Sequence, residues 1–536
     1  NGTITTSAAG TNNHIWVSIA AGGGAQRTMY FDNEGSIALN GAGDVFTVIG
    51  HEGAATGGFS IINNGALNLT GSAQRGIIVD SVYSYDSAEI LLNTPMNIVG
   101  SGSIGVALLG WADLDGGAAF RASTADNAVV ALPTTSRESV FKINSTGNND
   151  TALYFNSAST NIFGISDYTL TSVGSNNTAV FIQNGAVKLS DTNSAGAANT
   201  INMSGGKENV GIYTIAPDAL TTGADITITN SDSSVGIYSQ NATTVTNSGD
   251  ISVTGGSVKA IIADASAVTS TGAINLTGTS LTATDGSVGL VAQNGGSVTS
   301  TGTATIDVDG VASIGLFANN GTITIENSKI STTGGAFNTD SSNGGLINFN
   351  GSNNIINTGQ KSLAFLTNGG KISFNGATTA NIAGGTTSNT RGTAFYFVGT
   401  GYSSFDPTTT VAAWAGSSFN SSLGNLTLNM GAGSRLFIAS DVGVLLSNST
   451  PTNIFSAITG PTINGTDYKR LMLYISKLTV DQAVNLDNAT DAYNLLEVAN
   501  SSIINNNTIS GTQAGQVAMA QENDSTLYPK SKVTLT

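Results

Sequence analysis

One four-residue pattern returns between residues 210 and 397, and it constrains the fold more than any other feature of the sequence. It reads Val-Gly-Ile-Tyr at 210–213 and 235–238, with changed copies at 258–261, 288–291 and 314–317. Degenerate copies follow at 336–337, 363–366 and 394–397. Two further aliphatic series interleave with it, one at Val245, Val268, Val298, Ile323, Ile347 and Ile372, the other at Ile226, Ile251, Ile274, Ile306, Ile330, Ile355 and Ile382.

All three series lengthen at the same place. The first steps through positions 212, 237, 260 and 290, the second through 245, 268 and 298, and the third through 226, 251, 274 and 306. In each series the last of these steps is the long one. A long step shared by three registers indicates one insertion, after Leu276, in a chain that keeps returning to the same three lines.

The three lines carry apolar-polar-apolar triplets such as Ile226-Thr227-Ile228 and Ile323-Thr324-Ile325. This alternation is the period of a strand with one buried face. Three short strands per repeat, bounded by Gly, Asn and Ser, leave no room for a helix and predict an all-β parallel β-helix, or β-solenoid. Like residues then stack about 4.8 Å apart in successive coils. At about 26 residues per coil, the chain predicts about twenty coils, on the order of 100 Å in length.

The repeat weakens toward both ends, which suggests capped ends. Residues 1–75 are expected to form an N-terminal cap and the first coils, because an uncapped coil exposes strand edges. Residues 76–470 predict the body, with early rungs at 76–78, 105–107, 128–130 and 152–154 and inserted loops near 111–139, 277–287 and 399–420. Residues 471–536 predict the last coils, a cap and a linker, with a short helix within 488–499.

The composition limits the classes of partner that the chain is expected to bind. Charged residues are only 10% of the chain, against about 25% in ordinary globular domains. The net charge of −16, without any Lys/Arg cluster, argues against nucleic acid and anionic membranes. Cysteine is absent, so neither disulfides nor thiolate metal sites contribute, and no apolar run reaches the length of a membrane helix. The chain opens Asn1-Gly2-Thr3 without Met or a signal peptide and is expected to be a trimmed mature fragment.

Candidate catalytic groups are few. The two histidines, His14 and His51, lie in the irregular N-terminal part without a nucleophile motif beside them. Polysaccharide-cleaving solenoids use clustered carboxylates, and the best pairs are Asp113 with Asp115 and Asp307 with Asp309. We interpret these pairs as solvated acids, because alternation alone places such neighbours on one face. No catalytic residue, metal or cofactor is predicted.

Polar and aromatic side chains outside the apolar series have different expected roles. Asn247, Asn294, Asn319 and Asn320 are expected to stack at matching turns, where amides bond from coil to coil. Several aromatic residues lie instead in inserted or irregular segments, where recognition residues usually sit. These receptor-binding candidates are Tyr402, Phe405, Trp414, Phe419, Tyr83, Tyr85 and Trp111. For the 399–420 insertion, packing of the loop onto the coil is an equal alternative.

The repeats at 235–255, Val-Gly-Ile-Tyr-Ser-Gln-Asn followed by Val-Thr-Asn-Ser-Gly-Asp-Ile-Ser-Val-Thr-Gly, resemble passenger domains of bacterial type V autotransporters. They are closest in character to the large adhesins of oral Gram-negative anaerobes. The resemblance covers about 150 to 400. It implies a right-handed β-helix, exported through an outer-membrane β-barrel that lies outside this sequence. It also implies adhesion to host cells or other bacteria, and some such adhesins bind immunoglobulin-fold receptors of the carcinoembryonic-antigen (CEACAM) family. The serine-protease signature of some autotransporters is missing.

The leading expectation is a non-enzymatic adhesin on the bacterial surface, monomeric, whose loops bind a protein receptor on a host cell or a partner bacterium. A polysaccharide-degrading β-helix or a phage-type tail fibre is the alternative from another class. A spacer that holds a further domain away from the cell is a third.

Overall fold

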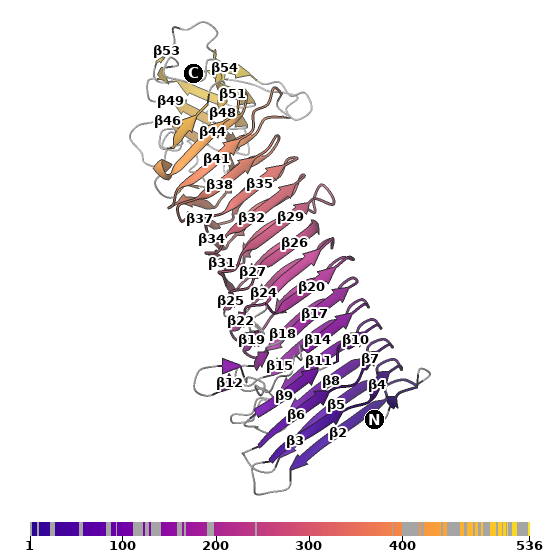
Figure 1. The fold of residues 1–536 in the computed structure, drawn as a ribbon. Helices are drawn as coiled ribbons and strands as arrows, with labels where there is room; N and C mark the ends of the chain where they lie inside the picture. Colours follow the sequence, from indigo (N-terminus) through magenta and orange to yellow (C-terminus); the bar gives the residue numbers. More distant parts are fainter. Residues whose placement is uncertain are drawn as a thin grey trace. The chain divides into compact units, whose positions relative to one another are not determined.

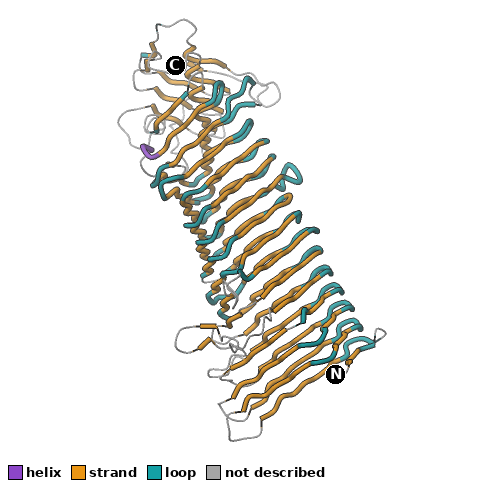
Figure 2. The backbone as a smooth tube through the Cα atoms, in the orientation of Figure 1, coloured by secondary structure: helices purple, strands orange, loops and turns teal. Residues whose placement is uncertain are grey.

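The computed structural model is an all-β parallel β-solenoid with three strands in each complete coil (Figure 1). The expected number of about twenty coils is not confirmed. In the part of the chain described below, one short 3-10 helix, η1 (Leu423–Asn425), is the only helical element (Figure 2). The structure describes residues 3–7, 10–21, 27–52, 57–81, 87–92, 94–110, 122–123, 128–129, 141–157, 163–165, 168–189, 198–241, 244–387, 390–398, 418–419, 423–440, 443–446, 461–465, 469–474, 477–480, 484–485, 494–499, 502–505, 508–510, 512, 517–521 and 534–535.

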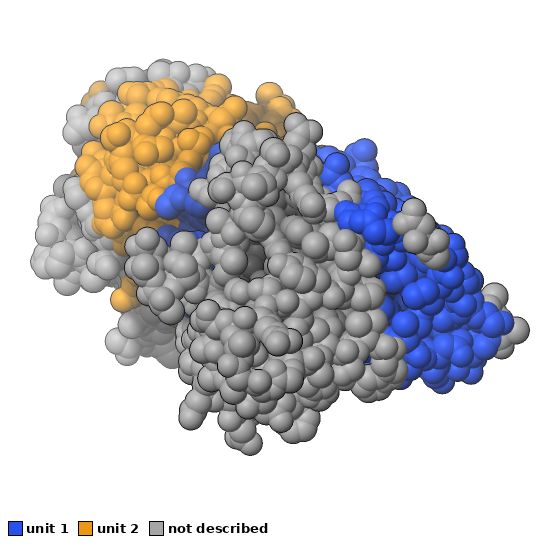
Figure 3. Space-filling view, turned by 60° about the horizontal axis from the view of Figure 1, so that its bottom comes forward, with its two compact units in different colours: residues 1–275 blue, residues 276–536 orange. Residues whose placement is uncertain are grey.

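The chain divides into two compact units, residues 1–275 and 276–536, drawn in blue and orange in Figure 3. Strand β29 (Ile274–Thr279) spans the boundary. In both units the chain runs through a strand of sheet 1, then of sheet 2, then of sheet 3, and each strand pairs in parallel with its counterpart in the next coil.

In unit 1, sheet 1 holds β1 (Thr3–Thr5), β4 (Ser36–Leu39), β7 (Leu67–Leu69), β10 (Met96–Ile98), β14 (Phe141–Ser145), β17 (Tyr168–Val173), β20 (Thr200–Ser204), β23 (Asp225–Thr229) and β26 (Ile251–Gly256). Sheet 2 holds β2 (His14–Ala21), β5 (Val45–Glu52), β8 (Arg75–Ser81), β11 (Ile104–Gly110), β15 (Thr151–Ser157), β18 (Thr178–Asn184), β21 (Val210–Thr214), β24 (Val235–Gln240) and β27 (Lys259–Asp264). The third side is formed first by β3 (Arg27–Asn33), β6 (Gly57–Asn63) and β9 (Ser87–Leu92), then by sheet 3 with β16 (Phe163–Ile165), β19 (Val187–Leu189), β22 (Leu220–Thr222), β25 (Val245–Asn247) and β28 (Ala267–Ser270).

In unit 2, sheet 1 holds β32 (Ala304–Asp309), β35 (Lys329–Thr333), β38 (Asn354–Thr358), β41 (Thr378–Ile382), β44 (Leu426–Met430) and β47 (Thr462–Asn464). Sheet 2 holds β30 (Val288–Gln293), β33 (Ile314–Asn319), β36 (Phe337–Ser342), β39 (Leu363–Asn368), β42 (Thr393–Val398), β45 (Arg435–Ser440), β48 (Lys469–Tyr474), β51 (Asn494–Ala499) and β54 (Val517–Gln521). Sheet 3 holds β31 (Ser297–Ser300), β34 (Thr322–Glu326), β37 (Leu346–Asn350), β40 (Lys371–Phe374) and β43 (Ser418–Phe419). Two smaller sheets follow, one of β46 (Gly443–Leu446), β49 (Lys477–Val480), β52 (Ser502–Asn505) and β55 (Thr534–Leu535), the other of β50 (Val484–Asn485) and β53 (Ile509–Ser510).

The three sequence series are the three sheets, so this part of the prediction is confirmed. Ile212 pairs with Ile237 in sheet 2, Ile226 with Ile251 in sheet 1, and Val245 with Val268 in sheet 3. The paired side chains point inward and are at most 1% exposed. The interior is thus a set of aliphatic columns. Each rung removes a side chain worth about 1.5–3 kcal/mol from water.

Some predicted rungs are displaced. Ile237 pairs with Ile261, one residue beyond the predicted Ala260. In the third series, the buried partner of Ile330 is Ile356, and the next rung is Ala380 instead of Ile382. Two adjacent aliphatic residues look alike in the sequence, and only the pairing decides which one faces inward.

Two local predictions are wrong. Ala128–Val129 is β13, which pairs in antiparallel fashion with β12 (Ala122–Ser123), so 128–130 is not a rung. In sheet 2, β11 pairs directly with β15, and Val106 pairs with Leu153. The short helix expected within 488–499 is contradicted over its described part, 494–499, because Asn494–Ala499 is strand β51 between β48 and β54. There the parallel pairing of Leu496 with Leu471 overrides a local helical pattern.

The Val-Gly-Ile-Tyr pattern has a geometric cause. Val235 and Ile237 pair with Lys259 and Ile261, while Gly236 between them has no partner in the register. Gly236 and Ile237 are both buried, so two consecutive residues face the interior before alternation resumes. A Cβ on Gly236 would stand 2.6 Å from the carbonyl oxygen of Ala260. The glycine therefore permits the close approach of the two strands at this point, and the residue after Ile237, Tyr238, faces outward.

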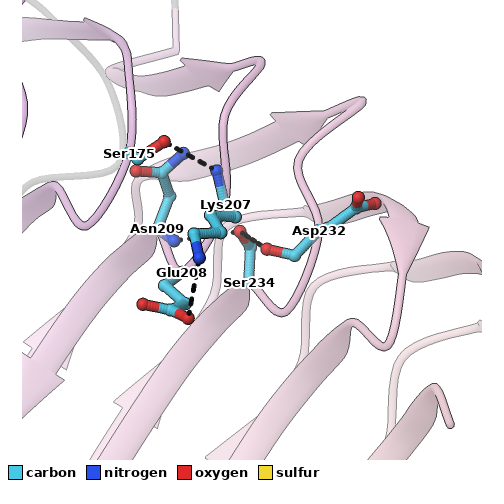
Figure 4. Close-up of polar contacts among 6 residues, drawn as sticks. All are labelled: Ser175, Lys207, Glu208, Asn209, Asp232 and Ser234. Atoms are coloured by element: carbon cyan, nitrogen blue, oxygen red, sulfur yellow. Dashed lines mark hydrogen bonds and ion pairs between the residues drawn. The ribbon is translucent and has the colours of Figure 1, made fainter. Parts of the chain in front are cut away.

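The turn from sheet 1 to sheet 2 repeats a second device. In unit 1 a residue with positive φ is followed by a buried polar residue, as in Glu208 (φ 57°) before Asn209 and Ser233 (φ 52°) before Ser234. The buried side chain accepts a hydrogen bond from the backbone of the preceding coil. Asn209 N–H donates to Ser234 Oγ at 3.0 Å, next to Lys207 N–H, which donates to Ser175 Oγ at 3.2 Å (Figure 4). This corner ladder fixes where each strand of sheet 2 begins.

Candidate functional site

Most of the sequence-predicted binding residues fall where the structure gives no description. Tyr83, Tyr85, Trp111, Tyr402, Phe405 and Trp414 lie outside the described residues. Phe419 lies in β43, where its backbone pairs with Ile372, and its side chain is outside the description. These residues stay predictions.

The candidate acids and histidines do not form a cluster in the described part of the chain. Asp307 and Asp309 both point outward from β32, as alternation predicts, and Asp309 Oδ1 accepts the Thr333 hydroxyl at 2.5 Å. His14 begins β2 and is exposed, while only the backbone of His51 is described. Asp113 and Asp115 lie outside the description. Among described residues, no three His, Asp or Glu side chains come close enough to hold a metal ion.

The predicted stack of four asparagines is also revised. Asn294 and Asn320 share one corner in unit 2, both with positive φ, and Asn319 accepts a hydrogen bond from Asn343 at 2.8 Å. Asn247 belongs to a different place, the buried side of sheet 3 in unit 1. There its amide donates to Gly249 O and to Ser270 Oγ.

The outer face of sheet 2 in unit 1 carries an aromatic column that the sequence analysis did not single out. Tyr154, Phe181, Tyr213 and Tyr238 come from successive strands β15, β18, β21 and β24 and pair in register. Their ring centroids are 5.5, 5.1 and 5.0 Å apart, with interplanar angles of 45°, 7° and 24°. We call these four residues the aromatic column. Each ring is half-buried.

Stacking decides which part of each ring can meet a partner. Because Phe181, Tyr213 and Tyr238 cover one another's faces, their ring edges and the tyrosine hydroxyl groups remain for contact from outside. The Tyr213 hydroxyl donates to Gln240 Oε1 at 3.1 Å, and the Tyr154 hydroxyl donates to Gln183 Oε1. The column thus presents apolar edges beside a row of polar groups.

The electrostatics of the column follow from its position. Burial raises the pKa of Tyr213 and of Tyr238, and the nearby carboxylate of Asp264 raises both further. Both phenols are therefore neutral at physiological pH. They can act as hydrogen-bond donors as well as acceptors.

Toward the N-terminus the same register position becomes aliphatic. Tyr154 pairs with Ala107, which pairs with Ile78. Ile78 and Ala107 pack with Val45 into a cluster that also touches Tyr154. The outer face of sheet 2 in unit 1 is therefore apolar over several consecutive strands.

The corner ladder positions this face. Ser103 N–H donates to Asp150 Oδ1, and Asp150 N–H donates to Asn177 Oδ1, each at 2.9 Å. Asn177 N–H then donates to Asn209 Oδ1 at the same distance. These residues directly precede strands of sheet 2. Their hydrogen bonds therefore fix the start of the strands that hold the aromatic column. The Lys207–Glu208 ion pair beside it, 3.8 Å long and more than half exposed, contributes little (Figure 4).

A signal for the column was present in the sequence. Tyr213 and Tyr238 are the fourth residues of the Val-Gly-Ile-Tyr copies, one position after the buried isoleucine, and Phe181 and Tyr154 occupy the same position. One residue beyond a buried position faces outward in a strand.

No protein-family model, curated protein or solved structure matches this chain. No helix in the described ranges is long and apolar enough to cross a membrane.

Proposed function

We propose that this chain is a non-enzymatic binding protein displayed on a bacterial surface, of the autotransporter passenger type. In this proposal the solenoid is right-handed and extends to about twenty coils. The lateral face of the solenoid binds a protein receptor of a host cell or of a partner bacterium. An immunoglobulin-fold receptor is the first candidate.

The observation that carries the proposal is the aromatic column on a rigid sheet. Tyrosine is enriched where proteins bind proteins, because it offers a large apolar body, few rotatable bonds and a hydroxyl group. Here the rings are held by stacking and by parallel pairing before any partner arrives. Little side-chain entropy then remains to be lost on binding.

The net charge of −16 also affects which partner surfaces the chain attracts. An acidic protein attracts basic surfaces and speeds their association at low ionic strength. A receptor with a basic rim around an apolar centre fits this face. The predicted loops near 111–139 and 399–420, with Tyr402, Phe405 and Trp414, are proposed as additional contacts.

The test uses the whole chain, intact epithelial cells and the isolated immunoglobulin-fold ectodomain. The double variant Tyr213→Ala/Tyr238→Ala should lower binding at least about tenfold, since each hot-spot residue contributes about 1–2 kcal/mol or more. Thr227→Ala, a half-buried outward position on β23 of sheet 1, is the matched control and should bind as the parent does.

Equal binding by the double variant and the control would reject the column as the receptor site. A parallel triple variant, Tyr402→Ala/Phe405→Ala/Trp414→Ala, separates loop binding from column binding. Release of reducing ends from a polysaccharide panel, abolished by Asp307→Asn, would instead favour the enzyme alternative.

A further inference from the structure

Sheet 1 of unit 2 carries a groove on its outer side. Its floor is a column of polar side chains from five successive strands, β35, β38, β41, β44 and β47. They are Ser331, Asn357, Asn381, Asn429 and Asn464. The groove has a volume of about 660 Å³, and its wall is formed by the residues that follow these strands, among them Gly359, Ala383, Gly431 and Gly465.

The floor is a hydrogen-bonded ladder. Asn357 Nδ2 donates to Ser331 Oγ at 3.4 Å, Asn381 to Asn357 Oδ1 at 2.9 Å, and Asn429 to Asn381 Oδ1 at 2.8 Å. Asn464 donates to Asn429 Oδ1 at 2.9 Å. Each amide group offers two donor hydrogens and two acceptor lone pairs, and the ladder uses one donor and one acceptor of an inner rung. A second donor and a second acceptor per inner rung then remain for a ligand.

Glycines in the wall allow the turns of neighbouring coils to pack closely together. A Cβ on Gly359 would stand 2.5 Å from Thr332 O, and one on Gly431 would stand 2.4 Å from the Gly384 nitrogen. Gly465, with φ of 120°, has a conformation that other residues rarely adopt. Larger residues at these places would displace the turns that bound the groove.

The groove lining contains no ionisable side chain. The nearest carboxylates in register are Asp307 and Asp309, which pair with Ser331 and Thr333 at one end. A bound anion would find no cation in the lining and would meet these acids and the overall negative charge. The chemistry of the site therefore selects an uncharged ligand with many hydroxyl groups.

The spacing of the rungs decides between ligand classes. The ladder repeats about every 4.8 Å, whereas an extended peptide repeats about every 3.3 Å, so a peptide laid along the ladder loses register within a few residues. Each inner strand of the sheet is already paired on both sides, so no free edge remains for a peptide to add as a further strand. A pyranose unit in an extended chain spans close to one rung and presents hydroxyl groups at each.

We propose that the ladder Ser331–Asn357–Asn381–Asn429–Asn464 is a binding site for a linear, neutral polysaccharide, which lies across the strands of sheet 1. Each sugar unit exchanges hydroxyl hydrogen bonds with one amide. This site is independent of the aromatic column, since it lies on another sheet and in the other unit. Either proposal can fail without the other.

The test measures retardation of the whole chain in native gels cast with soluble polymers. The neutral probes are a mixed-linkage β-glucan, a galactomannan and dextran, and the anionic probes are polygalacturonate and heparin. At least one neutral polymer should retard the protein, and the anionic polymers should not. Asn381→Leu/Asn429→Leu, which keeps side-chain size and removes the amides, should lower the apparent association constant at least about tenfold.

The matched control is Asn97→Leu. Asn97 belongs to the corresponding ladder of unit 1, where it donates to Asn68 Oδ1 at 2.9 Å and accepts from Asn144 at 3.3 Å. It should leave retardation unchanged. If the double leucine variant does not fold, Asn381→Thr replaces it, since Thr171 holds the same outward position on β17 of sheet 1.

Three results would overturn the proposal. They are no retardation by any neutral polymer, stronger retardation by the anionic polymers, and equal loss in Asn97→Leu and in the groove variants.

Discussion

Each unit has a group of neighbouring aromatic rings, and the two groups lie on different sides of their strands. In unit 1 the column of Tyr154, Phe181, Tyr213 and Tyr238 lies on the outer face of sheet 2, half-buried. In unit 2, Phe349, Phe365, Phe374, Phe395 and Phe437 are all less than 2% exposed and fill the interior. Ring spacings are alike, between 5.0 and 6.1 Å.

The two groups of rings differ by one residue in their position relative to the inward-facing residues of the strand. Phe365 stands in the register of Leu316 and Thr339, which face inward, whereas Tyr238 stands one position beyond the inward Ile237. Because side chains alternate with a period of two, this single step exchanges core for surface. The inner rings should therefore govern stability, and the outer rings should govern recognition.

The largest expected effect tests the inner rings. Phe365→Ala should lower the free energy of unfolding by about 3–5 kcal/mol, because it leaves a cavity beside Phe374 and Phe395. Phe181→Ala, the same truncation on the outer column, should lower it by about 1 kcal/mol. Denaturant unfolding followed by circular dichroism measures both. Equal losses would contradict the division between core and surface rings.

The next effect tests the glycine beside the inward-facing Ile237. Gly236→Val should destabilise the chain by about 1–3 kcal/mol, since its side chain meets the carbonyl of Ala260. It should also lower receptor binding by disturbing Tyr238. Gly295→Ala is a control with open space around its Cβ, although its φ of 83° adds a smaller strain in unit 2. A thermal midpoint unchanged in Gly236→Val would show that the close approach of these two strands does not need glycine.

A third effect concerns two acids of the corner ladder with opposite pKa shifts. Burial tends to raise the pKa of Asp44, but hydrogen bonds from Thr6, Asn13 and Gly41 hold it below its ordinary value of 3.8. Burial raises the pKa of Asp150, and hydrogen bonds from Ser103 and Ser145 offset this only in part. The contribution of Asp44 is present above about pH 3.8 and is lost as pH falls through its folded pKa. That of Asp150 is fully present below about pH 3.8 and is lost as pH rises through its folded pKa.

Asp44→Asn should therefore lower stability near neutral pH by about 1–3 kcal/mol, because it turns an amide donor toward donors. Asp150→Asn should keep or raise it. The next rung shows that asparagine fits this position of the ladder, because the amide of Asn177 donates hydrogen bonds to Gly147 O and Ser172 Oγ. Thermal midpoints measured across acidic to neutral pH test the signs. The same sign for both variants would refute the assignment.

The smallest effect concerns the column's phenols. Asp264→Asn should bring the pKa values of Tyr213 and Tyr238 closer to 10.0, because it removes one of the charges that raise them. Ultraviolet titration of the whole chain detects the shift as earlier ionisation of the affected tyrosines. A titration identical to the parent's would place Asp264 too far away to act.

The sequence was sufficient for the fold class because three periodic series lengthen together. The sequence did not decide which residue faces inward where two aliphatic residues are adjacent, as at Ala260-Ile261 and Ile355-Ile356. Both residues satisfy the pattern, and the strand pairing selects one of them. Asn494–Ala499 reads locally as a helix and is a strand only because a neighbouring coil pairs with it. The groove of unit 2 brings together residues from 331 to 465, and its outline depends on turns that no local pattern specifies.

The corner ladder has an evolutionary consequence. Aspartate, asparagine and serine all serve at its rungs, and each needs only a backbone N–H from the winding before it. A winding copied or deleted as a whole would therefore meet compatible neighbours on both sides. Genes for such chains can grow or shrink by tandem duplication, so the number of windings can change while the side-chain columns of each sheet are inherited intact.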